Sequence, residues 1–386
     1  MTQVLTALEI LRQLVSFPSV SRDSNLDLVD WLEGYLAAHA IPTVRHWHED
    51  GTKAALLAHA GPKVTGGVVL SGHSDVVPVD GQTWTSDPWT LTERDGRLYG
   101  RGTADMKGFV ALSVWALVAA QRLGVRRPLQ LALSYDEEVG CTGAAPMLST
   151  LVEAFPKADL AIIGEPSRMQ PIHGHKGGTG YRVHVKGFEV HSSLLPYGVS
   201  AIMEGARLIG WVNDRNAAQQ LPHPSALAAR FDPAFTTLHV GMIKGGTAHN
   251  ITAADCHFVT EFRVVPGEEI EDLAADFEAA AAALARSMSA VRPEAGIGLD
   301  RFFRVPPLAP EPHGAAEALV RQLTGANAGG VVSYGTEAGF FQAEGYSAVV
   351  CGPGDIAQAH QPNEYLEVSE FQAGQGFMSR LLELLA

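Results

Sequence analysis

Apolar residues near the start of the chain recur at helical spacing, first from Leu5 to Val15 and again from Leu28 to Leu36. A continuous apolar stretch from Met106 to about Leu123 predicts a buried helix. Short apolar runs predict strands around these helices, at 54–58, 68–71, 129–135 and 160–164. Strands that alternate with helices favour a largely parallel sheet covered on both faces. We therefore expect an α/β fold for this part of the chain.

The pattern changes near Gly177, after which half-exposed alternation and long polar helices follow one another. The expected elements are strands at 181–186, 237–243 and 257–264 and helices at 200–211 and 268–288. Beyond residue 291 the chain returns to strand-like runs at 331–333 and 348–351 and ends in a helix from about Val368. The chain is therefore expected to form one domain from residues 1–178 and 292–386, with an α+β domain inserted at 179–291. The glycines at 177–180 are interpreted as a flexible hinge between the two domains.

Composition narrows the possible partners. The 386 residues carry a formal net charge of −14, which argues against nucleic acid or an anionic membrane as a partner. Hydrophobic residues make up 46% and charged residues 18%, as in a globular protein with a large core. The three cysteines, Cys141, Cys256 and Cys351, are widely spaced and form no disulfide framework, and the first residues lack a signal-peptide pattern. We expect a cytoplasmic protein.

Five metal-binding side chains lie in short polar turns, most of them just beyond predicted strands. They are His73, Asp105, Glu138, Glu165 and His360. The carboxyl ends of strands are where ligands bind in open α/β sheets. Two imidazoles and three carboxylates suit a pair of divalent ions if one carboxylate is shared. The set therefore predicts a two-metal hydrolase.

Two neighbours extend this prediction. Asp75, in HSDVVP at 73–78, is placed to hold the His73 ring in its metal-binding tautomer. Glu137, in DEEVG at 136–140, is expected to be a free general base beside the ligand Glu138. The residues alone leave open an exchange of the roles of Glu137 and Glu138. Each motif alone is also weak, since an acidic pair after a strand is usually a solvated loop and a single histidine is usually a surface residue.

These motifs, together with GRGTADMKG at 100–108, GEP at 164–166 and AHQPNEY at 359–365, resemble the co-catalytic zinc metallopeptidase family. The resemblance runs from FPSVS at 17–21 to the last helix. It implies a zinc-peptidase-like catalytic domain with a mostly parallel sheet and an inserted dimerisation, or lid, domain. It also implies two divalent ions per subunit, zinc being expected and cobalt an alternative.

The resemblance also implies the ligand set. One ion takes His73, Asp105 and Glu165, and the other takes Asp105, Glu138 and His360, so that Asp105 bridges them. A cis peptide is implied between Asp105 and Met106. Glu137 is then expected to act as general base on a water shared by the two ions and to return the proton to the departing amine.

Further motifs in the inserted domain resemble the family's dimer and substrate contacts. GFEVHSS at 187–193 implies that His191 reaches the partner subunit's site and helps to form the oxyanion hole, which requires a homodimer. The alternative is an ordinary loop-capping histidine. GGTAHNI at 245–251 and EFRVVPG at 261–267 imply substrate-binding roles for Asn250 and Arg263. The alternative for Arg263 is a salt bridge on a strand face. Lys176 is a further candidate for a carboxylate contact.

The segment 333–365 points to a substrate class. It resembles family members that deacetylate N2-acetyl-L-ornithine in arginine biosynthesis, because GTEAGFF stands where desuccinylases usually carry a GTSDGRF-type segment. Gly335 and Thr336 are expected to meet the substrate backbone or carboxylate, and Glu337 the cationic side chain. The small-molecule substrate is thus expected to be an N-acyl amino acid. Deacylation of a related substrate, dipeptidase or carboxypeptidase activity, and a metal-bearing sensor remain alternatives.

Overall fold

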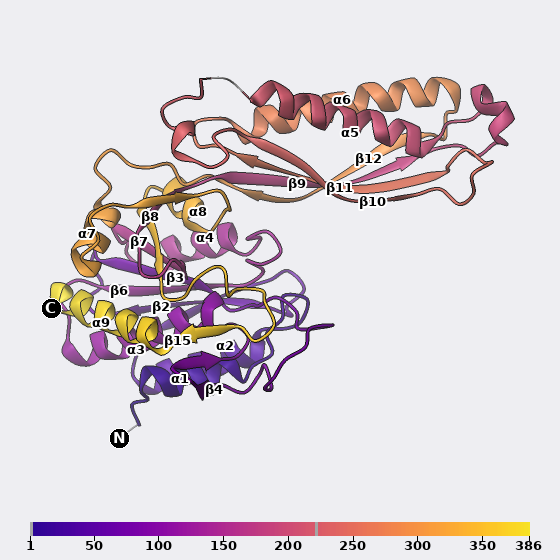
Figure 1. The fold of residues 1–386 in the computed structure, drawn as a ribbon. Coiled ribbons are helices and arrows are strands. Elements are labelled where there is room, and N and C mark those ends of the chain that lie inside the picture. Colours follow the sequence, from indigo (N-terminus) through magenta and orange to yellow (C-terminus); the bar gives the residue numbers. More distant parts are fainter. Residues whose placement is uncertain (1–2, 221–222) are drawn as a thin grey trace. The chain divides into compact units, whose positions relative to one another are not determined.

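The computed structural model describes residues 3–220 and 223–386. The first two residues of the stretch in which no signal peptide is expected lie outside the described residues. The described chain divides into two compact units (Figure 1). Unit 1 comprises residues up to Gly174, Leu308–Val331 and Thr336–Ala386. Unit 2 comprises His175–Pro307 and Val332–Gly335, a longer stretch than the predicted 179–291.

Unit 1 is built on a mixed sheet that, within the described residues, has eight strands in the order β1-β2-β6-β3-β7-β14-β8-β13. The strands are β1 (Thr43–Trp47), β2 (Ala54–Ala60), β3 (Val68–His73), β6 (Leu129–Ser134), β7 (Leu160–Pro166), β8 (Ile172–His175), β13 (Gly330–Val332) and β14 (Ser347–Gly352). The four central strands β6, β3, β7 and β14 are parallel. The flanking strands β2 and β8 pair antiparallel with them. The α/β class is confirmed, and its parallel part is the centre of the sheet.

Helices cover both faces of this sheet because its strands are apolar on both sides. Along β2, Leu56 and Ala58 pack into one core with α1, α2, α3, α7 and α9, while Ala55 and Leu57 pack into another with α4 and α8. Figure 1 shows α3 and α9 on one face and α4 and α8 on the other. The helices are α1 (Ala7–Val15), α2 (Leu26–Ala38), α3 (Gly108–Leu123), α4 (Ala144–Ala154), α7 (Ala315–Thr324), α8 (Ala338–Ala343) and α9 (Val368–Leu385).

Two smaller features complete unit 1. A three-stranded sheet pairs β4 (Thr92–Arg94), β5 (Arg97–Tyr99) and β15 (Tyr365–Glu367) in the order β15-β5-β4. The turn η1 (Thr103–Lys107) leads directly into α3. Of the described helices, the stretch Thr103–Leu123 is long and apolar enough to cross a membrane, but 89% of its most apolar window is buried inside the structure. That burial matches a core helix.

Unit 2 has an antiparallel sheet with two long helices on one face. The strand order is β10-β11-β9-β12, with β9 (Gly177–Lys186), β10 (Thr237–Gly245), β11 (Asp255–Val264) and β12 (Gly296–Val305). Helices α5 (Ala201–Gln219) and α6 (Ile270–Val291) pack on the apolar side of the sheet, and the short helical turns are η2 (Ser192–Tyr197) and η3 (Ala228–Arg230).

The glycines at 177–180 form the start of strand β9 and pair with β11 and β12 on both sides. The prediction of a flexible hinge over these residues is therefore wrong. Glycine is needed here for packing: a Cβ at Gly180 would lie 2.3 Å from the ring of Phe303. Backbone ladders on both edges hold this segment as a central strand.

Candidate metal centre and its surroundings

Three parallel strands bring most of the predicted ligands to one edge of the unit 1 sheet. His73 is the last residue of β3, Glu138 follows β6, and Glu165 lies near the end of β7. Strand β3 pairs with β6 on one side and β7 on the other, so the carboxyl ends of all three are neighbours. The topology alone therefore gathers an imidazole and two carboxylates separated by long stretches of sequence.

Loops supply the remaining two predicted ligands. Asp105 lies in η1, is 5% exposed and precedes a cis peptide bond to Met106, as the family resemblance implied. His360 lies in the loop between β14 and β15 with a positive φ of 63°. A non-glycine residue in that region is uncommon, although histidine adopts it more often than most.

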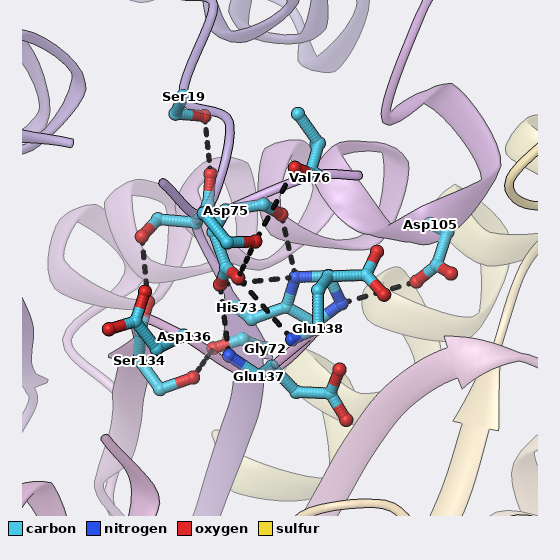
Figure 2. Close-up of polar contacts among 12 residues, drawn as sticks. Ser19, Gly72, His73, Asp75, Val76, Asp105, Ser134, Asp136, Glu137 and Glu138 are labelled. Carbon is cyan, nitrogen blue, oxygen red and sulfur yellow. Dashed lines mark hydrogen bonds and ion pairs between the residues drawn. The ribbon is translucent and has the colours of Figure 1, made fainter. Parts of the chain in front are cut away.

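Asp105 stands between the two histidines and presents a different oxygen to each. Its Oδ1 lies 3.2 Å from His73 Nε2, and its Oδ2 lies 3.2 Å from His360 Nε2. Glu138 Oε2 is 3.0 Å from His360 Nε2, and Glu165 Oε1 is 3.8 Å from His73 Nε2. Figure 2 shows the His73 ring directed at Asp105. The five predicted ligands thus form two clusters that share one carboxylate.

The chemistry of this cluster suits cations. Glu138 Oε1 and Glu165 Oε1 are buried and have no hydrogen-bond partner among the described residues. Burial, reinforced by the charge of Asp105, raises the pKa of Glu138 to about 8 and that of Glu165 well above its usual value. Buried carboxylates with unpaired oxygens are costly unless a counter-charge satisfies them. Two divalent ions fit these donors, since imidazole and carboxylate are common ligands of zinc and related metals.

Asp75 supports the cluster through atoms other than those predicted. His73 Nδ1 lies 2.8 Å from the backbone carbonyl oxygen of Asp75, whereas the nearest carboxylate oxygen is 3.7 Å away. The carbonyl therefore fixes the His73 tautomer and leaves Nε2 for a metal. The Asp75 carboxylate instead accepts a hydrogen bond from the Ser21 hydroxyl. It also accepts hydrogen bonds from the backbone N–H groups of Glu137 and Glu138 (Figure 2). It orients the acidic pair rather than the imidazole.

Glu137 lies partly buried beside the cluster. Its Oε1 accepts a hydrogen bond from the Cys141 thiol at 3.3 Å, and burial raises its pKa to about 7. Glu137, His73 and Glu165 also offer ligand atoms within 4.8 Å of one another. The Glu137 carboxylate could therefore contact either an ion held by His73 and Glu165 or a water molecule beside that ion.

Glu364 is an important residue that the sequence analysis missed. Its carboxylate, 1% exposed, accepts hydrogen bonds from the backbone N–H groups of Gly102, Ala104 and Asp105 at 3.0, 2.9 and 3.1 Å. It also accepts one from the buried Arg101 guanidinium at 2.6 Å. Glu364 lies four residues after His360, so one side chain ties the Asp105 turn to the His360 loop. The sequence signal that could have identified Glu364 is its position in the motif AHQPNEY, which also contains the predicted ligand His360.

Glu337 is enclosed within unit 1. It is 1% exposed, and Ser71 Oγ donates to its Oε2 at 3.4 Å from the strand that carries His73. Burial raises the pKa of Glu337 to about 7. The predicted contact with a cationic substrate side chain is not supported, because the surrounding side chains cover the carboxyl group. Neighbouring Thr336 is also buried, and its Oγ1 accepts a hydrogen bond from Ala338 N at the start of α8.

Unit 2 carries most of the predicted substrate residues. His191 is exposed at the start of η2, where its Nδ1 lies 2.8 Å from Ser193 Oγ. Asn250 is exposed on the adjacent loop, and its backbone carbonyl oxygen accepts a hydrogen bond from the Ser192 backbone N–H. Arg263 donates to Glu261 at 3.0 Å, so the salt bridge weighed as an alternative is present. The structure thus leaves His191 and Asn250 accessible on unit 2.

Two further predicted substrate residues, Lys176 and Gly335, make contacts that hold unit 2 together. Lys176 is fully buried, and its ammonium donates to the carbonyl oxygens of Pro233 and Phe235 at 2.8 and 2.7 Å. The prediction of a substrate contact for Lys176 is therefore not supported, because its charge is used to hold this loop. At Gly335, a Cβ would lie 3.2 Å from Val305 and 3.3 Å from the Lys176 carbonyl oxygen. A close approach of chain segments thus accounts for this glycine.

A mixed α/β scaffold with a largely buried imidazole and carboxylate cluster at the carboxyl ends of its strands defines a hydrolase of the metallopeptidase class. Residues 69–384 match the model of peptidase family M20/M25/M40, and the chain belongs to this family. It is 38% identical over 395 residues to an acetylornithine deacetylase from Myxococcus xanthus, with 98% of each chain covered.

Solved structures share the fold at low sequence identity. An M20 family metallo-carboxypeptidase from Sulfolobus solfataricus matches with a TM-score of 0.78 at 16% identity, covering 99% of both chains. A dinuclear metal binding peptidase of the M20 family from Bacillus subtilis matches with a TM-score of 0.66 at 14% identity, covering 98% of this chain and 97% of that one. Both the predicted family and the predicted fold class are confirmed.

Proposed function

We propose that this protein hydrolyses the amide bond of N2-acetyl-L-ornithine and releases acetate and L-ornithine. The observation that best supports a two-metal amidohydrolase is the position of Asp105, whose two oxygens each face a different histidine. The 38% identity to an acetylornithine deacetylase over nearly the whole of both chains supports the substrate. Membership of the M20 family supports hydrolysis of an amide in an amino-acid derivative.

His73, Asp105 and Glu165 would hold one divalent ion, and Asp105, Glu138 and His360 the other. Such ions, with zinc favoured by the nitrogen and carboxylate donors, supply Lewis-acid polarisation of a carbonyl and lower the pKa of water. Two neighbouring groups of the protein position these ligands. The Asp75 carbonyl fixes the His73 ring, and the Glu364 carboxylate fixes the turn that carries Asp105.

Glu137 would carry the proton. Its carboxylate accepts a proton from the attacking water as the water oxygen bonds to the amide carbon, and returns it to the nitrogen as the C–N bond breaks. Glu137 is therefore deprotonated again at the end of each turnover. Burial keeps the Glu137 pKa near neutrality, which suits a group that must both accept and donate a proton.

We further propose that unit 2 is a dimerisation and lid domain. An exposed apolar surface at η2 and the start of α5 supports this proposal. Its residues are Leu194, Leu195, Tyr197, Ile202, Met203 and Ile251, and Ile251 pairs with His191 through an isolated backbone bridge. Exposed apolar side chains that lie together mark interaction sites. A homodimer through this surface would cover it and would allow His191 to serve the partner's site, as the family resemblance implies.

The substrate proposal is tested by comparing kcat/KM on N2-acetyl-L-ornithine, N-acetyl-L-citrulline, N-succinyl-diaminopimelate and a simple dipeptide. We expect a preference of ~10²-fold or more for N2-acetyl-L-ornithine, lost on chelation and restored by zinc. Faster metal-dependent turnover of another panel member would reject the substrate and keep the two-metal mechanism. Turnover that survives complete removal of metal would reject the mechanism itself.

The role of Glu137 is tested by Glu137→Gln, with Glu138→Gln as the matched neighbour. If Glu137 is the base, its variant retains two ions per chain and loses at least ~10²-fold in kcat. Glu138→Gln instead lowers metal content, because it removes a ligand. Loss of metal in the Glu137 variant, with full occupancy in the other, would exchange the two roles.

A further inference from the structure

We propose that unit 2 contains a separate binding site for one divalent transition-metal ion, formed by His184, Asp255 and His257. These residues belong to strands β9 and β11, and none of them takes part in the proposed reaction. The inference does not depend on the proposed function, since it rests on the sheet of unit 2 alone.

The sheet register brings the three side chains together. His184 in β9 is the direct cross-strand partner of His257 in β11, and Asp255 lies two residues before His257. Side chains alternate along a strand, so Asp255 and His257 point to one face and the intervening Cys256 to the other. Cys256 and the next residue, Phe258, are buried in the core with α5 and α6. The three candidate ligands therefore project from the face opposite these helices.

The ligand atoms are already close. His184 Nε2 is 2.7 Å from Asp255 Oδ1, and the His184 and His257 rings stack with centroids 4.1 Å apart and planes 9° apart. One ligand atom from each residue lies within 4.8 Å of the other two. Directly paired residues of adjacent strands change their separation little, since the backbone ladder fixes their Cα atoms. An ion would thus replace the His184–Asp255 hydrogen bond with little movement of the backbone.

The donor set indicates which ions bind. Two imidazoles with one carboxylate suit zinc, nickel, cobalt and copper, whereas magnesium and calcium prefer sites made of oxygen. The site borders a hollow of about 550 Å³ that is also lined by Met242, Lys244 and Val259. Water in this hollow can complete the coordination of an ion with three protein ligands.

The surroundings of the cluster limit its affinity. Lys244 is the cross-strand neighbour of His257, and Lys186 that of Asp255, so two ammonium groups oppose a bound cation. The side chains of His184 and Asp255 are 44% and 58% exposed, which screens this repulsion and also weakens the ion–carboxylate attraction. We therefore expect affinity in the micromolar range, weaker than at a buried structural zinc site.

The test uses full-length protein with the catalytic cluster already loaded with zinc. Zinc is titrated into this holoenzyme in a calorimeter, with magnesium as the comparison ion. We expect one further zinc ion per chain and no magnesium binding at the same concentrations. His184→Gln and His257→Gln should each weaken this event by at least ~10-fold, the lower end of the loss seen when a partner of a metal ligand is removed.

His239→Gln is the matched control. His239 is exposed on β10 and pairs with Glu261, so it lies on the same face at a different position along β11. It should leave the additional zinc event unchanged. Anomalous diffraction at the zinc edge should then locate the ion between His184 and His257. The proposal is overturned if no additional zinc binds below millimolar concentration, or if His239→Gln weakens binding as much as His184→Gln.

Discussion

Glu364 offers the sharpest test of how the catalytic cluster is built. Its carboxylate is fully enclosed and accepts four hydrogen bonds, one from Arg101 and three from backbone N–H groups of the turn that presents Asp105. Replacing it with glutamine keeps the shape but puts an NH2 group where an acceptor is needed. At least one donor then faces another donor, and the Arg101 charge loses its partner.

The magnitude follows from burial. Arg101 and Glu364 side chains are each 1% exposed, and removal of one partner from such a pair typically costs about 3 to 5 kcal/mol. Arg101 keeps a 2.7 Å hydrogen bond to Gln82 Oε1, which favours the lower end of that range. Since Asp105 contacts both histidines, loosening its turn should weaken both metal sites together rather than one of them.

Three measurements on Glu364→Gln check this reasoning: urea unfolding, metal content after dialysis against a weak chelator, and kcat at saturating zinc. We expect a loss of about 3 kcal/mol in stability and the loss of both ions at chelator concentrations that leave wild type loaded. Glu367→Gln is the control, because its 2.9 Å pair with Arg97 is partly exposed and should be worth at most about 1 kcal/mol. A destabilised Glu364 variant with normal metal retention and kcat would refute a positioning role.

Three other substitutions extend the test to separate parts of the molecule. In metal-free protein, burial raises the pKa of Glu337 from 4.5 to about 7, so its carboxyl group costs stability as pH rises through that window. Glu337→Gln should therefore gain up to about 3 kcal/mol relative to wild type between pH 4 and 8, and a pH-independent difference in urea unfolding would contradict this. Leu194→Glu should weaken the proposed homodimer at least ~10-fold in sedimentation equilibrium, whereas Val64→Glu, exposed on unit 1, should not. Lys176→Met should destabilise the protein by about 1 to 3 kcal/mol, because two half-buried carbonyl groups lose their donor. A lower melting temperature is expected, and an unchanged one would argue that water replaces the ammonium.

The sequence predicts best where periodicity and burial agree. The apolar run that forms α3 and the strands that lead to His73, Glu138 and Glu165 are visible as continuous apolar segments followed by polar turns. Because parallel strands end at one edge, order along the chain was enough to predict that these ligands meet. The family motifs then indicated which carboxylate is shared.

The prediction fails where long-range contacts override local signals. Glycines usually mark loops, yet those at the start of β9 are required because Phe303 packs against Gly180. Strand β12 was missed because its residues are mostly half-exposed. Lys176 was predicted to contact substrate, but its ammonium instead binds two backbone carbonyl oxygens that lie 57 and 59 residues further along the chain. Such distant partners cannot be identified from the residues around Lys176. The Asp75 carbonyl that orients His73 is a backbone group, which residue type cannot reveal.

The position of β14 has a consequence for the order in which the protein can form during synthesis. This strand lies between β7 and β8 inside the unit 1 sheet, although the whole of unit 2 separates it from β7 in sequence. A nascent chain that has completed unit 2 still lacks this strand, His360 and Glu364. Domains generally fold as units as the chain emerges, so unit 2 can fold first while the interrupted unit 1 waits for its final segment. On the proposed ligand assignment, the cluster can therefore acquire its metal only after His360 and Glu364 have been synthesised, which places metal binding after the folding of unit 2.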